Sequence, residues 1–361
     1  MKASRTASLT ALLMIGALTL TACGDPDAGS TAGNADIDCA SGDIKGAGST
    51  FQKNMVQQWI KDYTAACDGA TVDYQGIGSG AGIKQFGSAT TDFAGSDSVM
   101  KDQERADADR TCGSPAVHLP VTAGAIAIAY NLPDVEDLRL SPGTIAGIFT
   151  GRIKAWDDAA IKADNPSASL PETAITAVHR EDSSGSTDVF SKFLGKTAGT
   201  AWTLGTGKEL DWPGSIQGAK GSDGVTQAAA ATEGGVTYAE VSYVDSGGLR
   251  SAKVRNGAGG FEAPDAANVT AALAGATLPA SGNDLIVTYD FASTTPRAYP
   301  ITAVSYEIVC SKGKDAAKQA LLKSFLTYAV TGGQEAAEDT GYAPLPAGMS
   351  TRVSTAIAAL G

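Results

Sequence analysis

Three glycine- and serine-rich segments share one place in the sequence pattern: each follows a strand-like run and precedes a run with helical periodicity. They are GAGSTF at residues 46–51, GIGSGAG at 76–82 and REDSSGST at 180–187. Strands and helices that alternate through short glycine turns are typical of α/β folds. Because a helix start offers unpaired N–H groups and the positive end of the helix dipole, each turn is a candidate anion site.

The alternation of strands and helices extends over most of the chain. A first helix is expected over residues 51–67, because Phe51, Met55 and Trp59 fall on one helical face. Further helices are expected at 83–86, 141–149, 186–194, 224–231, 265–274 and 314–330. Strands are expected at 44–48, 71–75, 91–95, 116–130, 174–179, 235–238, 285–289 and 299–309. The pattern predicts α/β layers with mostly parallel sheets, and the length favours two lobes.

Charge and composition exclude several classes of function. The chain carries 27 Lys+Arg against 39 Asp+Glu, a net charge of −12, and only 6% aromatic residues. Such a chain is poorly suited to gripping nucleic-acid backbones, so no nucleic-acid partner is expected. With two histidines and no C-x-x-C spacing, neither a metal site nor a cofactor is expected.

The N-terminal residues carry an export pattern. A basic start and an apolar run at residues 9–20, too short for a comfortable membrane span, are typical of a secretory signal peptide. The run ends in LTAC, which resembles the lipobox of bacterial lipoproteins, so residues 1–22 are expected to be removed and Cys23 lipidated. Residues 23–38 then form the lipidated end and a flexible tether. The protein is expected outside the cytoplasm, lipid-anchored to the outer face of the cell membrane.

Four further cysteines suit an oxidising compartment. They are Cys39, Cys67, Cys112 and Cys310. An even number of cysteines outside the cytoplasm favours disulfides over free thiols, and four cysteines allow three pairings. A local bridge between Cys39 and Cys67 is the simplest, which leaves Cys112 for Cys310, but the connectivity stays open.

Asp97 is the unusual residue among the candidate anion turns. It follows the strand at 91–95, at the edge where the other turns are expected. A carboxylate beside a bound anion is repulsive unless the ligand carries a proton to donate, as phosphate does at neutral pH and sulfate does not. A site built to accept such a hydrogen bond can reject the analogue that lacks it by about 10⁴-fold. Asp97 therefore favours phosphate over sulfate or molybdate.

Several longer motifs resemble the periplasmic-type phosphate-binding proteins of phosphate-specific ABC transporters. They are GAGSTF, YQGIGSGAGIKQF, DFAGSD, HREDSSGST, GRIKAWDD at 151–158 and AYPIT at 298–302. The resemblance implies a two-lobed periplasmic-binding-protein fold (type II-like), with two crossing hinge strands near 121–125 and 299–303. It implies the chain order lobe I (39–122), lobe II (123–299) and lobe I again (300–361), with phosphate sealed between the lobes.

The resemblance also carries a set of phosphate ligands onto this sequence. They are Thr50, Phe51 through its backbone N–H, Ser79, Asp97, Arg180, Ser184, Gly185 and Ser186. The sequence departs from the family pattern at Ser183, where glycine is common, and at Ser186, where threonine is common. Asp182 is expected to pair with Arg180 and hold its guanidinium in place, with helix capping as the alternative.

The implied function is high-affinity phosphate binding and delivery to the permease subunits of an ABC transporter, by a monomer that performs no chemistry on its ligand. Two enzyme classes fit less well. A dinucleotide-binding fingerprint at residues 76–81 is followed by Asp97 about 20 residues on, but it explains neither of the other turns. A serine hydrolase would use Ser184 or Ser186, yet the sequence has no G-x-S-x-G elbow.

Overall fold

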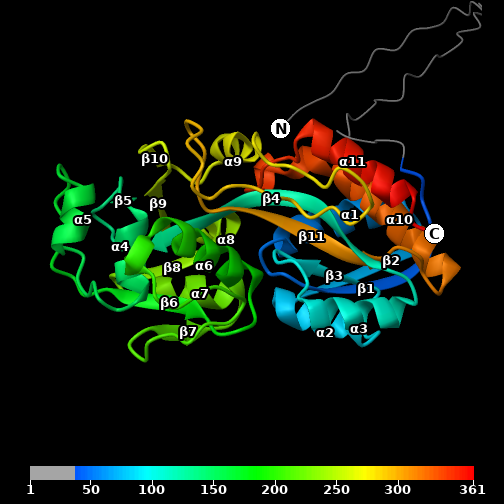
Figure 1. The fold of residues 1–361 in the computed structure, drawn as a ribbon, viewed down its shortest axis with the longest axis horizontal. Helices are drawn as coiled ribbons and strands as arrows, with labels where there is room; N and C mark the ends of the chain where they lie inside the picture. The colour runs from blue at the N-terminus through cyan, green and yellow to red at the C-terminus, as the bar shows by residue number, and fades with distance from the viewer. Residues whose placement is uncertain (1–36) are drawn as a thin grey trace, which may run out of the picture. The chain divides into compact units, whose positions relative to one another are not determined.

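The computed structural model describes residues 37–361, which belong to one compact unit, Ala35–Gly361. The expected signal peptide at residues 1–22, the lipidation site Cys23 and nearly all of the tether lie outside the described residues. No helix of the described part combines the length and the apolar character that crossing a membrane requires. The architecture below is therefore that of the chain after residue 36 (Figure 1).

Three parallel strands form one end of a mixed sheet. They are β1 (Gly42–Gly48), β2 (Ala70–Gly76) and β3 (Phe93–Ser96), followed in turn by α1 (Lys53–Ala66), α2 (Ser79–Gly87) and α3 (Asp102–Cys112). Because β1 pairs in parallel with both β2 and β3, the carboxyl ends of all three strands lie at one edge. Met55, Trp59 and Tyr63 are buried along one face of α1, as the sequence spacing predicts.

Three more parallel strands form the other end of the sheet. They are β6 (Thr176–Arg180), β7 (Gln217–Ala219) and β8 (Gly235–Glu240). β6 lies between β8 and β7, and α6 (Gly185–Thr197) and α7 (Gly221–Ala230) follow β6 and β7 along the chain. Each of these helices begins at the carboxyl end of the strand before it, so both helix starts lie at one edge.

Two long strands connect the two ends of the sheet. β4 (Ala116–Tyr130) is buried throughout and pairs antiparallel with β11 (Thr302–Cys310) as far as Ala125, then with β8 from Ile126 onward. β11 also pairs antiparallel with β3. The described strands thus follow the order β2-β1-β3-β11-β4-β8-β6-β7, and Figure 1 shows β4 and β11 running side by side between the two ends.

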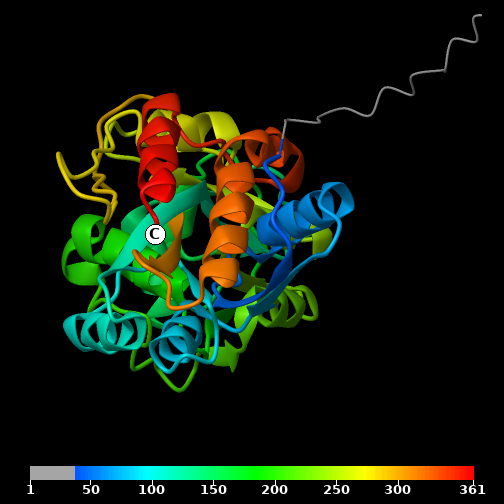
Figure 2. The same ribbon diagram turned by 90° about the vertical axis from the view of Figure 1, so that its right-hand side faces the viewer.

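Three further strands branch from this order, because β9 (Arg250–Arg255) pairs antiparallel with β4 and β10 (Phe261–Glu262) and in parallel with β5 (Arg139–Leu140), and the remaining helices pack on the sheet. These helices are α4 (Pro142–Phe149), α5 (Ala159–Asp164), η1 (Gly199–Ala201), α8 (Val241–Ser246), α9 (Ala266–Leu273), α10 (Ala316–Val330), η2 (Gly332–Ala336), η3 (Glu338–Thr340) and α11 (Ala347–Ala358). α10 and α11 pack against each other and against β4, beside the strands of the first end (Figure 2). The C-terminal residues therefore complete the end of the sheet at which the described chain begins.

Two secondary-structure predictions are wrong. The sheet is mixed rather than mostly parallel, because β4 leaves the first end of the sheet and β11 returns to it in the opposite direction. Residues 285–289 do not form a strand: only Thr288 makes an isolated bridge, to Thr277. Their alternating pattern arises because Leu285 and Val287 are buried, while the Val287 N–H donates to the Tyr306 hydroxyl instead of to a strand partner.

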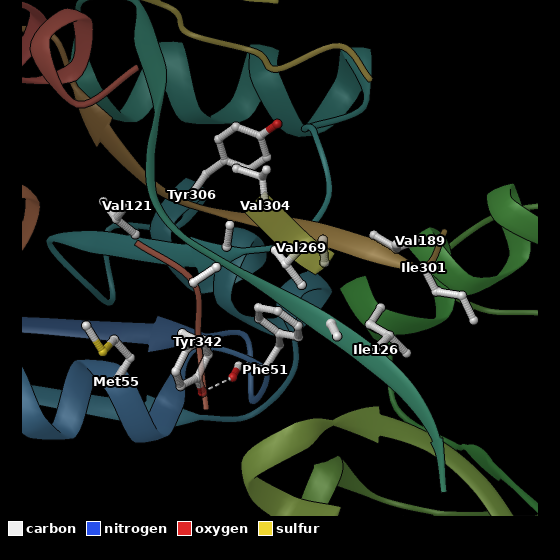
Figure 3. Close-up of a cluster of buried hydrophobic side chains, with 14 of the residues drawn as sticks. Phe51, Met55, Val121, Ile126, Val189, Val269, Ile301, Val304, Tyr306 and Tyr342 are labelled. Atoms are coloured by element: carbon white, nitrogen blue, oxygen red, sulfur yellow. Dashed lines mark hydrogen bonds between the residues drawn. The ribbon is translucent and has the colours of Figure 1, made fainter. Parts of the chain in front are cut away.

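A cluster of buried hydrophobic side chains packs against Phe51, the last residue of the GAGSTF turn (Figure 3). The Phe51 ring lies edge-on to Tyr342, with ring centroids 5.8 Å apart, and the Tyr342 hydroxyl donates a 2.5 Å hydrogen bond to the Phe51 carbonyl. Both side chains are fully buried, in one hydrophobic core with Ile126 and Ile301 of the connecting region. The backbone of the turn is therefore fixed by a residue almost 300 positions later in the chain.

The structure contains two disulfides, Cys39–Cys67 and Cys112–Cys310. The Cα atoms are 5.3 Å and 5.4 Å apart, well within the distance that a disulfide spans. The simplest of the three possible pairings is confirmed. The second bridge ties the end of α3 to the end of β11 and so joins distant parts of the chain.

The two disulfides should stabilise the fold unequally, because the loops they close have different lengths. The sequence separations are 28 and 198 residues. In the chain-entropy model, replacing the Cys112–Cys310 pair by alanines costs about 5 kcal/mol of unfolding free energy, and replacing the Cys39–Cys67 pair about 3.5 kcal/mol. Urea unfolding of the two double variants measures the difference, and a larger loss from the shorter loop would contradict this order.

Candidate functional site

The candidate anion turns from both ends of the sheet lie in direct contact. The Asp97 N–H donates to Ser79 Oγ at 3.2 Å, and the Gly80 N–H donates to the Ser183 carbonyl at 2.9 Å. A side chain on Gly185 would collide with Ser79 Oγ and lie 2.6 Å from Asp97 Oδ2. The start of α6 therefore approaches β3 and α2 so closely that only glycine fits at this position.

Asp97 lies at the end of β3 and is only 6% exposed. Its Oδ1 accepts hydrogen bonds from Ser49 Oγ at 2.6 Å and from Ser305 Oγ at 2.7 Å. Oδ2, the oxygen on the side of Gly185, receives no hydrogen bond from the described residues. Burial raises the pKa of Asp97 to about 6, although the hydroxyl hydrogen bonds and the Arg180 charge oppose the rise.

Arg180 and Asp182 form a largely buried, bidentate ion pair. Arg180 Nε donates to Asp182 Oδ1 at 2.7 Å, and Nη2 donates to Oδ2 at 2.5 Å. The Gly221 N–H donates to the same carboxylate at 2.9 Å. Burial alone would raise the pKa of Asp182, but the hydrogen bonds and charge of Arg180 outweigh it and lower the pKa. The guanidinium is thereby fixed at the end of β6.

Ser222, at the start of α7, is a site residue that the sequence reasoning missed. Its Oγ lies 2.8 Å from Thr50 Oγ1, and Arg180 Nη1 donates to it at 3.4 Å. Ser222 thus joins the GAGSTF turn to the Arg180 turn. A signal was present in the sequence, because KGSDG at 220–224 is a fourth glycine–serine turn before a helix.

The other predicted ligands differ in how available their donors are. Ser184 caps α6 by accepting a 3.2 Å hydrogen bond from the Thr187 N–H. Ser186 Oγ is buried and has no hydrogen-bond partner among the described residues. The Phe51 N–H is engaged, because it donates to Ser49 Oγ at 3.0 Å. An unpaired buried hydroxyl is costly, which makes Ser186 a clear candidate donor for a ligand.

Contacts around the turns hold the two ends of the sheet together. Ser98 Oγ donates to Asp188 Oδ2 at 2.8 Å, and Asn54 Nδ2 donates to Ser242 Oγ at 2.7 Å. Lys208 is 6% exposed and forms a 2.7 Å ion pair with Glu104 on α3. The candidate site therefore lies between the two ends of the sheet, with these contacts around it.

Within the described part of the chain, the turns bring together hydrogen-bond donors, the fixed Arg180 cation and the Asp97 acceptor. Of the two histidines, His179 stacks on Trp212 and His118 is buried against Asp284, so neither activates a site serine. Within residues 37–361, no group of three or more His, Cys, Asp or Glu side chains is placed to hold a metal ion. The geometry suits reversible binding of a small oxyanion that carries a proton.

Comparisons with known proteins agree on one family. The profile of the PBP superfamily domain matches residues 33–332. Phosphate-binding protein PstS 3 of Mycobacterium tuberculosis is 40% identical over 370 residues, covering 100% of both chains. Phosphate-binding protein PstS of Xylella fastidiosa is 35% identical over 308 residues, covering 84% of this chain and 81% of its own.

Solved structures show the same fold. The structure of PfluDING, a high-affinity periplasmic phosphate-binding protein with bound phosphate, matches with a TM-score of 0.70 at 23% identity, covering 87% of this chain and 93% of its own. This likeness confirms the predicted periplasmic-binding-protein fold. The full-length sequence relatives go further: the chain belongs to the PBP superfamily and, within it, to the family of PstS phosphate-binding proteins.

Proposed function

We propose that this protein binds inorganic phosphate between the two groups of turns and delivers it to an ABC permease, without chemistry on the ligand. The observation that carries the proposal is the placing of Asp97 Oδ2 beside the start of α6 and near the Arg180 charge. A carboxylate in an anion site is tolerated when the anion brings a proton. The names of the sequence relatives, which are phosphate-binding proteins, point the same way.

The proposed ligands supply complementary groups to a tetrahedral anion. Arg180 supplies the charge, and Asp97 accepts the ligand's proton. The proposed hydrogen-bond donors are the hydroxyls and backbone groups of Thr50, Ser79, Ser184, Gly185 and Ser186, and the Phe51 N–H, which would exchange its contact with Ser49 Oγ for one with the anion. Charge-assisted hydrogen bonds contribute about 1.5–3 kcal/mol each, so a handful of them reaches micromolar affinity, about −8 kcal/mol, after desolvation. Asp182 does not contact the anion in this proposal. Its 2.5 Å ion pair holds the Arg180 guanidinium in the orientation that faces the anion.

We assign lobe I to residues 39–122 and 300–361 and lobe II to 123–299. The change of partner along β4, from β11 up to Ala125 to β8 from Ile126, supports a crossing at that point. The interlobe contacts of Thr50, Ser222 and Arg180 then belong to the closed form, and ligand exchange requires hinge opening about β4 and β11. The protein acts as a monomer.

The proposed location is the outer face of the cell membrane, with a lipid on Cys23 and a tether that leads to the folded residues. The apolar run, the LTAC motif and the two disulfides support this location, because disulfides persist in oxidising compartments. The partner would be the membrane permease of a phosphate ABC transporter, with its separate ATPase subunit. The family membership supports that partner.

Replacing Arg180 by alanine should abolish tight phosphate binding, because it removes the site's buried cation and leaves the Asp182 carboxylate beside the anion. We expect at least a hundredfold rise in Kd, about 3 kcal/mol. Calorimetric titration of the ligand-free protein measures it. The matched control is Arg110→Ala, because the Arg110 side chain is 72% exposed on α3 and, among residues 37–361, forms an ion pair with Asp107 alone. Equal effects of the two substitutions would refute the role of Arg180.

Discrimination against sulfate should depend on pH, because Asp97 changes from acceptor to donor when it is protonated. Its pKa lies at about 6. Above that pH the ionised carboxylate accepts the phosphate proton and repels sulfate, whereas below it the carboxylic acid donates to sulfate. We expect no sulfate binding at pH 8 and calorimetrically measurable sulfate binding at pH 5. Equal rejection of sulfate at both pH values would contradict this role.

The Asp97→Asn variant should bind sulfate at pH 8 and lose this pH dependence. Because the pKa of Asp97 is raised in the folded protein, its stabilising contribution is complete below its ordinary value of 3.8 and is lost as the pH rises through about 6. At pH 8 the ligand-free variant should therefore unfold at the same urea concentration as the parent protein or a higher one. A stable variant that still rejects sulfate would show that another residue selects the anion.

A further inference from the structure

A fully buried chain of polar side chains runs from Asp97 away from the anion turns. Ser305 Oγ on β11 lies 2.7 Å from both Asp97 Oδ1 and Gln52 Oε1. Gln52 Nε2 lies 2.6 Å from Glu307 Oε1, two residues further along β11. Gln52, Ser305 and Glu307 are each at most 1% exposed. The chain has no part in holding the anion directly, yet it ends on the one acceptor of the site.

A count of protons shows a conflict in this chain. Ser305 has a single hydroxyl proton, and its two close neighbours are both oxygens. An ionised Asp97, the form that accepts a hydrogen bond from phosphate, also accepts the hydrogen bond of the Ser305 hydroxyl. Gln52 Oε1 and Ser305 Oγ are then two acceptors 2.7 Å apart, with no proton between them. Inside a protein, such a pair is destabilising.

A half-turn of the Gln52 amide removes the conflict at Ser305. It gives up the 3.2 Å hydrogen bond from Gln52 Nε2 to the Tyr74 hydroxyl, which is longer than the 2.7 Å contact at Ser305, and it places a requirement on Glu307. The amide nitrogen then donates to Ser305, and the amide oxygen faces Glu307, so the 2.6 Å contact needs a proton from Glu307. Tyr74 does not supply it, because its hydroxyl donates to the Ser49 carbonyl at 2.9 Å and lies farther from Gln52, at 3.2 Å.

We propose that Glu307 is a neutral carboxylic acid that donates through Gln52 and Ser305 to hold Asp97 as an ionised acceptor. The chain reads Glu307 to Gln52 to Ser305 to Asp97, with every proton used once. Glu307 is thus a positioning residue that acts on the anion site through two others. This inference rests on the proposed function and deepens it, since it names what fixes the selectivity of Asp97.

The surroundings of Glu307 agree with a protonated carboxyl. Its Oε2 has no hydrogen-bond partner among the described residues, and an ionised carboxylate so placed would be very costly. Burial, together with repulsion from Asp97, raises the pKa of Glu307 well above its usual value. The other titratable groups that interact with Asp97 or Glu307 are four tyrosines and Arg180, and among these only Arg180 is cationic. The tyrosines are Tyr74, Tyr243, Tyr289 and Tyr306.

Two substitutions at one position test the proposal. Glu307→Met fills a similar volume without a donor, whereas Glu307→Gln keeps an N–H donor toward Gln52. Without the donor at position 307, the Gln52 amide oxygen can turn back to Ser305 and accept its hydroxyl hydrogen bond. Asp97 then loses a hydrogen bond that stabilises its ionised form, so its pKa rises. We expect Glu307→Met to shift the pH at which sulfate begins to bind upward by about one unit, the equivalent of a tenfold change. Glu307→Gln should behave like the parent protein.

The matched control is Thr122→Val on β4. Thr122 lies opposite Ser305 in the strand register and is equally buried, and its hydroxyl has no partner among the described residues. This variant removes a buried hydroxyl next to the chain without interrupting it, so the pH threshold for sulfate should not move. A Glu307→Met protein with an unshifted threshold, or an equal shift in Thr122→Val, would overturn the proposal.

Infrared spectroscopy of the ligand-free protein decides the matter independently of folding in Glu307→Met and of any phosphate binding. At pH 8, we expect the parent protein to show a carbonyl band of a buried, protonated carboxylic acid that is absent from Glu307→Gln. Its absence from the parent would overturn the donor chain. If that band is present while phosphate does not bind, the proposed function fails and the protonation of Glu307 stands.

Discussion

The burial of one carboxylate, Asp97, beside the candidate anion turns is the constraint on which the rest of this structure depends. Asp97 is 6% exposed, and its Oδ1 is satisfied by the hydroxyls of Ser49 and Ser305. Ser49 follows β1 and Ser305 lies on β11, far apart in the sequence, so the acceptor is formed only when β11 has returned to the first end of the sheet. The same carboxylate would repel an anion that carries no proton, such as sulfate. The repulsion between like charges would therefore select phosphate over sulfate.

The arrangement of the sheet explains how a single anion can be contacted by segments more than 100 residues apart. Parallel strands at both ends direct their helix starts to the edges that face each other, and β4 and β11 tie the two ends together. Ser222 illustrates the result, because its hydroxyl contacts Thr50 from one end and approaches Arg180 from the other. Closure and assembly of the site are then the same event in the proposed mechanism.

Much of this was readable from the sequence, and the failures have physical causes. The glycine turns before helices could be identified because close backbone approach requires glycine, and the structure brings these turns into contact. Helix α3 was missed because it is strongly polar and buries only Ala108 and Cys112, so its apolar periodicity is weak. The antiparallel course of β11, the contacts of Ser305 and the role of Ser222 depend on pairing between distant segments, which no local pattern contains.

In the proposed complex, phosphate donates a hydrogen bond to an ionised Asp97. Neutron diffraction from crystals of the deuterated phosphate complex at pH 8 tests it most directly, because it locates the deuterons. We expect a deuteron between a phosphate oxygen and Asp97 Oδ2, with the Arg180 guanidinium in contact with the other, negatively charged phosphate oxygens. A bound phosphate whose oxygens all lie beyond hydrogen-bond distance of Asp97 would contradict it.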